Sequence, residues 1–328
     1  MVLEMKNLNI ILLSILVGLF FVSLNVGTLD ISIFKVLIGK ASITDSAIFW
    51  KIRFPRSALA ILVGAALGIS GAAMQGLLRN PLADSSVLGI SGGAVLGAMA
   101  VLYSGFTAWG IWMLPAGGFL GALIAAILIL IFCVHHTSLL GLILAGTALN
   151  TLFFALSSLL LSFSKNPYAV LEVIYWQMGS FENRTLEQVI VVMPWILLGI
   201  FLLLRTAPPL RLLTLGEDVA HSSGVSMPKT MRLVVLGTAI CVGAAVSVSG
   251  VIGFVGLLVP HVVRPWVKHD PGKLLFPSAL AGAVFLLVAD TFCRLPIFQV
   301  ELKIGVLTAL LGTPFFIYLA FKSRSQLI

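Results

Sequence analysis

The chain has 328 residues, of which 59% are hydrophobic and only 10% charged, and its mean hydropathy is +1.13. An average soluble domain has ~45–50% apolar residues, so this composition predicts a polytopic membrane protein without a separate soluble domain. The formal charge of +8 comes from Lys and Arg scattered through short loops. This scatter is typical of membrane flanks and argues against nucleic acid as a partner.

Ten apolar runs follow one another along the chain, and most approach the ~20 residues that a membrane-spanning helix needs. They cover residues 8–27, 57–78, 86–104, 111–134, 138–162, 188–204, 233–249, 251–267, 274–293 and 303–321. The first run resembles a signal peptide, but its length and the lack of an A-x-A-like cleavage site favour a retained span. An even number of spans places both termini on one side, although the positive-inside rule settles the orientation only weakly.

The polar stretch from Arg79 to Ala94 reads RNPLADSSVLGISGGA and separates the second run from the third. Its first residues predict a sharp turn, and Asp84 or Ser85 is suited to cap the next helix. The glycines that follow allow the backbone to come close to a neighbour or a pathway. The stretch is only superficially similar to a phosphate-binding loop, because the chain contains no GxxxxGK[ST] motif.

The longest polar interruption runs from Arg205 to Arg232. Thr214 and Glu217 have the spacing of a capping box, and Gly224 suits a helix stop. We expect a helix of about two turns over residues 215–223, which is too short to be stable alone. The apolar residues that share one face of this helix, and the prolines that separate it from its neighbours, are Leu215, Val219, Ala220, Pro208, Pro209 and Pro228. A docking element is therefore predicted.

Several stretches together resemble the transmembrane subunit of type II ABC importers, the permease family for iron–siderophore complexes, haem and cobalamin. They are RFPR (53–56), the glycine-rich stretch 64–94, LAGTALN (144–150), YWQMGSF (175–181), LGEDVAHSSGV (215–225), GVIGFVGLLVPHVVR (250–264), ADTFCR (289–294) and ELKIGVLTALLGTPFF (301–316). The chain departs from the family pattern at Ser85, Ser223, the loop 268–273 and Lys303.

The resemblance implies one permease domain, residues 1–328, with ten transmembrane helices, both termini cytoplasmic, and a dimer around a central translocation pathway. The implied partners are a second, identical permease subunit, two cytoplasmic ATPases that dock on the coupling region of about 205–232, and an extracytoplasmic binding protein. ATP and Mg then belong to the ATPase, and this chain is expected to carry no cofactor. The implied location is the bacterial inner membrane. The expected cargo is a ferric siderophore or haem, with cobalamin or another metal complex or oxyanion as the alternative.

Candidate site residues follow from the same resemblance. The expected ATPase-coupling residues are Thr214, Leu215, Gly216, Glu217, Asp218, Val219, Ala220, His221 and Gly224. A lipid-bound amphipathic helix is the alternative, but acidic residues suit an anionic membrane poorly. The arginines expected to receive carboxylates of the binding protein are Arg53, Arg56 and Arg294, for which simple interfacial anchoring is the alternative.

Polar residues within apolar runs are candidates for the pathway, although each suits helix–helix hydrogen bonding at least as well. They are Gln75, Asn80, Ser91, Thr147, Asn150 and Gln177. No metal site is expected at His261 or at His135 with His136, and the cysteines Cys133, Cys241 and Cys293 are interpreted as buried thiols. Asp290 and Glu301 are expected to pair with Arg294 or Lys303.

Two other classes of function are less compatible with the sequence. An ion-coupled secondary transporter usually needs carboxylates near the bilayer midplane, whereas the acidic residues here fall at span ends. An intramembrane enzyme would need a motif such as HExxH or GxSxG, and neither occurs. No catalytic residue is therefore expected.

Overall fold

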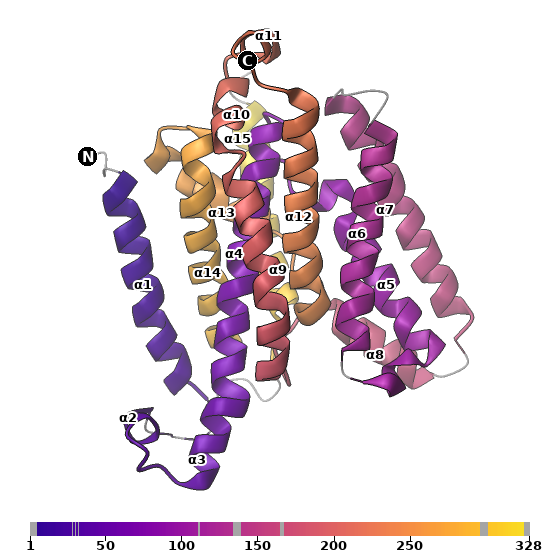
Figure 1. The fold of residues 1–328 in the computed structure, drawn as a ribbon. Coiled ribbons are helices and arrows are strands. Elements are labelled where there is room, and N and C mark those ends of the chain that lie inside the picture. The colour runs from indigo at the N-terminus through magenta and orange to yellow at the C-terminus, as the bar shows by residue number, and fades with distance from the viewer. Residues whose placement is uncertain are drawn as a thin grey trace.

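The computed structural model describes residues 5–27, 29, 31, 33–110, 112–133, 139–164, 167–295 and 301–324. Most of them lie in long helices that run up and down through one bundle (Figure 1). Within this described part, seven helices are long and apolar enough to cross a membrane, and three further apolar helices are shorter. The predicted class, an all-helical multi-pass membrane protein, is confirmed.

Each predicted apolar run coincides with one helix. The ten helices are α1 (Met5–Asn25), α4 (Phe54–Leu77), α5 (Ile90–Ser104), α6 (Met113–Cys133), α7 (Leu139–Ser162), α9 (Leu186–Leu204), α12 (Met227–Ser249), α13 (Val255–Val263), α14 (Pro271–Cys293) and α15 (Ile304–Arg324). The shorter elements between them are α2 (Ile33–Leu37), α3 (Ile43–Ile48), η1 (Phe49–Arg53), η2 (Ser85–Leu88), η3 (Phe106–Trp109), α8 (Pro167–Gln177), α10 (Ala207–Leu213), α11 (Glu217–Ser222) and η4 (Arg264–Val267).

Helix α4 lies at the centre of the bundle, and its side chains are buried along nearly the whole length. It crosses α14 and α13 at glycines. A Cβ atom added to Gly64 would lie 2.3 Å from the carbonyl oxygen of Gly282, and one added to Gly71 would lie 1.9 Å from that of Gly256. Lipid supplies no hydrophobic drive between helices, so close backbone packing takes its place. These contacts between glycines are therefore structural.

A second set of helices, α5, α6 and α7, lies on the right of Figure 1. Helices α5 and α6 also cross through glycines, since a Cβ atom on Gly97 would lie 2.1 Å from the carbonyl oxygen of Gly117. Helix α7 is different, because half of its side chains are exposed and few are buried. Much of the surface of α7 thus has no protein neighbour within this chain.

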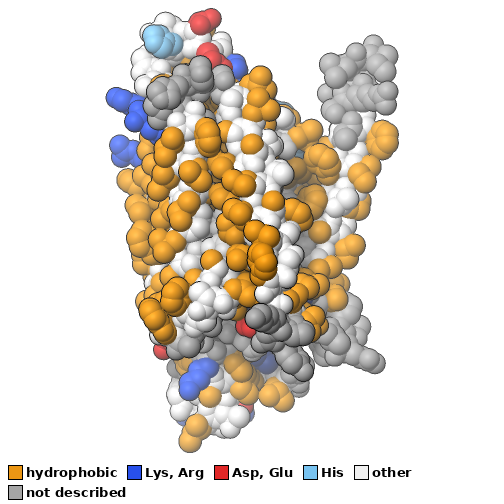
Figure 2. Space-filling view, turned by 90° about the vertical axis from the view of Figure 1, so that its right-hand side faces the viewer, with side chains coloured by type: hydrophobic (Ala, Val, Ile, Leu, Met, Phe, Trp, Pro, Cys, Tyr) orange, Lys and Arg blue, Asp and Glu red, His pale blue; other side chains and the backbone are white. Residues whose placement is uncertain are grey.

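The two ends of the bundle differ in what they carry. Helix α1 begins and α15 ends at the same end as α10 and α11, while α2, α3 and α8 lie at the opposite end (Figure 1). We call these the α11 side and the α3 side. Charged side chains gather toward the two ends, and a broad band of hydrophobic side chains lies between them (Figure 2). This distribution is the one expected of a protein embedded in a bilayer.

Candidate translocation pathway and docking surfaces

The predicted coupling region forms two short helices, α10 and α11, which project at the α11 side (Figure 1). The predicted capping box at Thr214 is wrong. Helix α10 extends through Leu213, so Thr214 has a helical backbone and its hydroxyl donates back to the Arg211 carbonyl oxygen at 2.7 Å. A capping residue needs an extended backbone, which Thr214 lacks. Instead, α11 begins after Gly216, whose φ of 109° suits glycine alone.

The end of α11 agrees with the prediction. Gly224 has a φ of 84°, and its N–H donates to the His221 carbonyl oxygen at 2.9 Å. Of the predicted apolar face, only Ala220 is buried, whereas Leu215 and Val219 are 63% and 44% exposed. The tip of α11 therefore presents apolar side chains outward beside the acidic Glu217 and Asp218.

Ion pairs connect this region to the bundle. The guanidinium of Arg79, just beyond α4, lies 2.7 Å from the carboxylate of Glu217, so Glu217 is an ion-pair partner and not a cap. The guanidinium of Arg211 in α10 lies 2.9 Å from Asp270. Asp270 also caps α14 by accepting from the N–H of Gly272 at 2.9 Å. Helices α10 and α11 are thus connected to both α4 and α14 at the α11 side.

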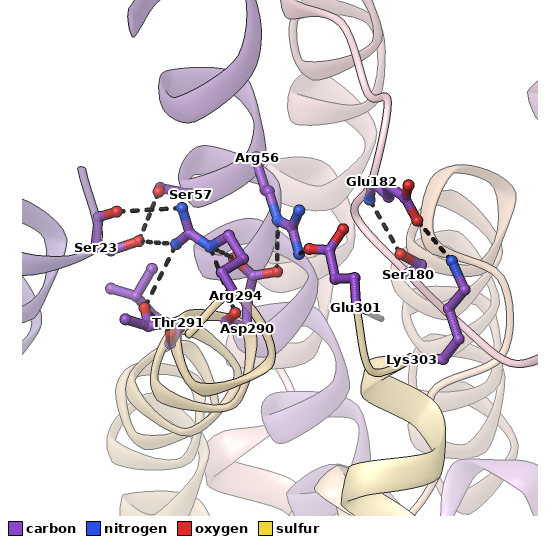
Figure 3. A network of polar contacts seen from close by, with 11 residues as sticks. Ser23, Arg56, Ser57, Ser180, Glu182, Asp290, Thr291, Arg294, Glu301 and Lys303 are labelled. Atoms are coloured by element: carbon purple, nitrogen blue, oxygen red, sulfur yellow. Dashed lines mark hydrogen bonds and ion pairs between the residues drawn. The ribbon is translucent and has the colours of Figure 1, made fainter. Parts of the chain in front are cut away.

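A cluster of buried charges occupies the α3 side (Figure 3). Asp290 of α14 is completely buried and contacts the guanidinium groups of Arg56 at 2.8 Å and Arg294 at 3.1 Å. Arg56 also forms an ion pair with Glu301. Arg294 donates to the carbonyl oxygen of Ser23 at 3.2 Å, which connects the cluster to α1. With two cations and two anions the cluster is formally neutral, and this makes its burial tolerable.

The pairing of acidic residues agrees only in part with the prediction. Asp290 does pair with Arg294, but Glu301 pairs with Arg56 because the chain after residue 300 passes beside the start of α4. Lys303 instead lies 2.6 Å from Glu182, in the loop between α8 and α9. Burial lowers the pKa of Arg184 in the same loop, and the negative charge of Glu182 opposes this shift.

The three predicted docking arginines all lie on the α3 side, yet each already has acceptors within the chain. Arg53 is buried and donates to the carbonyl oxygens of Leu24 and Asn25, both at 2.9 Å, and of Leu29. These bonds hold the lobe formed by α2, α3 and η1, which has its own small core. Arg56 and Arg294 belong to the charge cluster. Their role in docking stays a prediction.

Two grooves contain the polar residues that best fit a pathway. The larger, of about 640 Å³, runs along α15 from Gly305 to Pro314 and is completed by Gln177, Met178 and the segment 251–254. The smaller, of about 330 Å³, lies between α5, α7 and α8 and contains Asn150 and Gln177. The structure thus brings Asn150 and Gln177, which lines both grooves, to one region, and their role in a pathway stays a prediction.

The other four pathway candidates lie elsewhere. Gln75 is buried and donates to the carbonyl oxygens of Gly256 and Leu257 at 3.3 Å, which is the helix–helix bonding that the sequence left open. Asn80 accepts from the N–H of Leu82 at 2.9 Å in the turn after α4. Thr147 bonds back to its own helix, and Ser91 is half-buried in the first turn of α5.

Other residues that line these grooves were not predicted from the sequence. Thr151, Ser157 and Ser158 line the smaller groove on α7. A helical wheel that placed them on the same face as Asn150 would have found them. Phe254 lines the larger groove with an unusual φ of 66°, and its ring contacts the backbone at Gly312. Nothing in the sequence around Phe254, which stands between Gly253 and Gly256, indicated that it would line a groove.

The remaining sequence predictions concern cysteines and histidines. Cys241 and Cys293 are free and buried as expected, and the side chain of Cys133 lies outside the described residues. His261 stacks edge to face on Phe315, with 5.6 Å between the ring centroids. His135 and His136 also lie outside the described residues. Across the described ranges, no three His, Cys, Asp or Glu side chains gather in a way that could hold a metal ion.

Seven helices long and apolar enough to cross a membrane, grooves along α15 and α7, and a projecting short helix are the features expected of a multi-pass transport protein. Comparison with known proteins agrees. Residues 11–322 match the model of the FecCD transport family, and the chain belongs to this family. It is therefore a permease subunit of an ABC transporter.

Relatives with assigned roles support this assignment. The hemin transport system permease protein HmuU of Yersinia pestis is 40% identical over 323 residues, which cover 96% of this chain and 95% of the relative. The vitamin B12 import system permease protein BtuC of Citrobacter koseri is 38% identical over 275 residues, or 84% and 83% of the two chains. A solved metal-chelate type ABC transporter in an inward-facing conformation superimposes with a TM-score of 0.86 at 32% identity, over 96% of this chain and 98% of the other.

Proposed function

We propose that two copies of this chain form the membrane channel of an importer that takes up a metal chelate, either a ferric siderophore or haem. The family match carries this proposal. Cobalamin, or another metal complex or oxyanion, is the second candidate, because a relative at 38% identity is named for vitamin B12. The larger groove supports a bulky cargo of low charge, since its lining residues are apolar except for Gln177 and Thr313.

The proposed energy source is ATP, hydrolysed with Mg by two copies of a separate cytoplasmic ATPase. The projecting α11 supplies the contact: its exposed Val219, together with Leu215 just before the helix, suits an apolar groove on that partner. The acidic residues of α11 suit a basic rim around such a groove. A lipid surface is a poorer partner, because Glu217 and Asp218 would be repelled by anionic headgroups. The α11 side is then cytoplasmic, with both termini on it, in the inner membrane of a bacterium.

We further propose ten spans and a dimer formed through α7 and α15. The apolar helices α5, with 15 residues, and α13, with 9 residues, are too short to span a bilayer alone, which is tolerated where protein or a water-filled cavity satisfies the backbone of the flanking segments. Both α7 and α15 carry large exposed apolar side chains, including Phe154 at 73% and Phe321 at 69% exposure. A second copy that packs there would place the two grooves of each subunit beside the central pathway.

The proposed binding-protein surface is the α3 side, where Arg53, Arg56 and Arg294 lie. Because these arginines already bond to acceptors within the chain, an acidic partner would add to these bonds or exchange with them. Arginine suits such sharing, since its planar guanidinium has five donors and keeps its charge.

The test is ATP-driven uptake into proteoliposomes that contain the permease, its ATPase and its binding protein. Haemin, a ferric hydroxamate siderophore and cyanocobalamin are offered in turn, with a non-hydrolysable ATP analogue as the matched control. We expect uptake of one chelate, stimulated by ATP alone. If ATP stimulates uptake of none of them, the proposal is wrong; uptake that follows an ion gradient without ATP would favour a secondary transporter.

A further inference from the structure

Charges from two different elements hold the start of α15. Glu301 forms an ion pair with Arg56 of α4, and Lys303 lies 2.6 Å from Glu182 in the loop between α8 and α9 (Figure 3). The Glu301 side chain is 27% exposed, and those of Lys303 and Glu182 are 22% and 37% exposed. Both pairs therefore lie at the boundary between the bundle interior and the α3 surface.

Backbone packing is tight immediately beyond these two residues. The N–H of Gly305 points to the carbonyl oxygen of Gly179 at 3.5 Å. A Cβ atom at Gly305 would lie 2.3 Å from the carbonyl oxygen of Met178 and 2.8 Å from that of Val251. Three backbone segments, one each from α15, the end of α8 and the loop after α12, thus meet without intervening side chains. A small shift of α15 here must move the other two segments or open a gap between them.

The same three segments form the α3 end of the larger groove. Met178, Val251 and Gly305 all line it, and the groove continues along α15 as far as Pro314. Pro314 lies inside the helix and cannot donate a backbone hydrogen bond, so α15 can bend at this point more easily than a regular helix. The placement of residues 301–305 therefore determines how wide the groove is at its α3 end.

We propose that Glu301 and Lys303 are positioning residues for transport, which hold the first turn of α15 and thereby fix the entrance of the groove. The two pairs differ in strength. Arg56 belongs to a buried neutral cluster and provides a fixed point, whereas the Lys303–Glu182 pair is partly exposed and contributes less. Charged side chains of a partner that docks on the α3 side can replace Glu182 or Lys303 in this second pair before they affect the buried cluster. The start of α15 would then be released, and the groove would open. This inference rests on the proposed function for its transport readout.

The experiment uses the complete transporter in proteoliposomes and reverses the exposed pair. Lys303→Glu places two carboxylates together, Glu182→Lys places two ammonium groups together, and the double exchange restores an ion pair of opposite direction. Glu172→Lys is the matched control, because Glu172 is an exposed carboxylate of α8 on the same side. Spin labels are attached to cysteines placed at positions 302 and 187, in a background in which the three native cysteines are replaced by alanine. Pulsed electron paramagnetic resonance then measures the distance between the start of α15 and the start of α9.

We expect each single reversal to broaden the distance distribution and to lower the maximal uptake rate about fivefold, the low end for coupled sites. The melting temperature should stay unchanged, and the double exchange should restore both readouts. Lys303→Met should also broaden the distance distribution and lower the uptake rate, but by less. This variant replaces Lys303→Glu in the test if Lys303→Glu fails to fold.

Two results would overturn the inference: a narrow distance distribution in Lys303→Glu, or a double exchange that folds but restores neither readout. A loss of uptake with unchanged distances also overturns it, because positioning is then not the cause. If the unmodified transporter shows no ATP-stimulated uptake, the proposed function fails, and the distance measurement still decides whether Lys303 positions α15.

Discussion

The buried charge cluster makes a strong prediction about Asp290. The change Asp290→Asn removes one negative charge and keeps the shape of the side chain almost unchanged. Arg56 and Arg294 would then lie close together with Glu301 as their remaining carboxylate within the cluster, so the cluster would carry a net positive charge. Packing defects contribute little to this variant, and its loss of stability therefore measures the electrostatics.

The expected loss is large because Asp290 has no exposed surface and lies 2.8 Å and 3.1 Å from its two partners. Removing one member of a buried ion pair costs roughly 3–5 kcal/mol, since the remaining charge stays buried without compensation. For a chain longer than 150 residues, a loss of this size lowers the melting temperature on the order of 10 °C. Helices α4 and α14 should separate first at their α3 ends.

The assay is thermal unfolding of the purified protein in nanodiscs, followed by the fluorescence of its tryptophans. Glu187→Gln, the same kind of change at an exposed carboxylate in the first turn of α9, is the control and should shift the melting temperature by no more than ~1 °C. If Asp290→Asn melts within about 2 °C of the unmodified protein, the cluster does not stabilise the bundle and the reasoning fails.

Three further predictions concern other parts of the chain. Gly71→Ala should prevent assembly of the bundle, seen as aggregation in size-exclusion chromatography, because the new Cβ would lie 1.9 Å from a carbonyl oxygen; Gly18→Ala, with nothing within 4 Å, should behave normally. Arg53→Gln should make residues 26–52 sensitive to trypsin, because the bonds of Arg53 to carbonyl oxygens hold the lobe of α2, α3 and η1. The control Lys51→Gln, at an exposed site, should resist trypsin under the same conditions. Val219→Asp should leave stability unchanged but lower transport per ATP hydrolysed, and normal coupling would show that α11 is not the contact.

The spans could be predicted from the sequence because each depends on its own residues. A run such as 57–78 is almost entirely apolar, and lipid leaves such a segment no alternative to a helix. Residues typical of helix ends also predicted the ends correctly where no neighbouring element determined the local backbone. Gly224 ends α11, and Asp84 caps η2 by accepting from the N–H of Ser85 at 2.6 Å.

Local signals failed where a neighbouring element decided the outcome. Thr214 and Glu217 have the spacing of a capping box, but α10 extends up to Thr214 and determines its backbone. The equivalent spacing at Thr185 and Gln188 does form a capping box, because an irregular loop precedes it. The ion-pair partner of Glu301 could likewise not be predicted from the sequence, because Lys303 is nearer in the chain but Arg56 is nearer in space.

Helices α4 and α14 physically join the two surfaces at which partners are proposed to dock. On the α11 side, Arg79 beyond α4 pairs with Glu217. On the same side, Asp270 caps α14 and also pairs with Arg211 of α10. On the α3 side, Arg56 of α4 pairs with Asp290 of α14. Between these ends the backbones touch at glycines, so no flexible side-chain layer lies there to absorb a movement. A displacement of α11 by an ATPase would therefore reach the arginines of the opposite side through packed backbone, which is how a subunit that receives its energy on one side can act on the other.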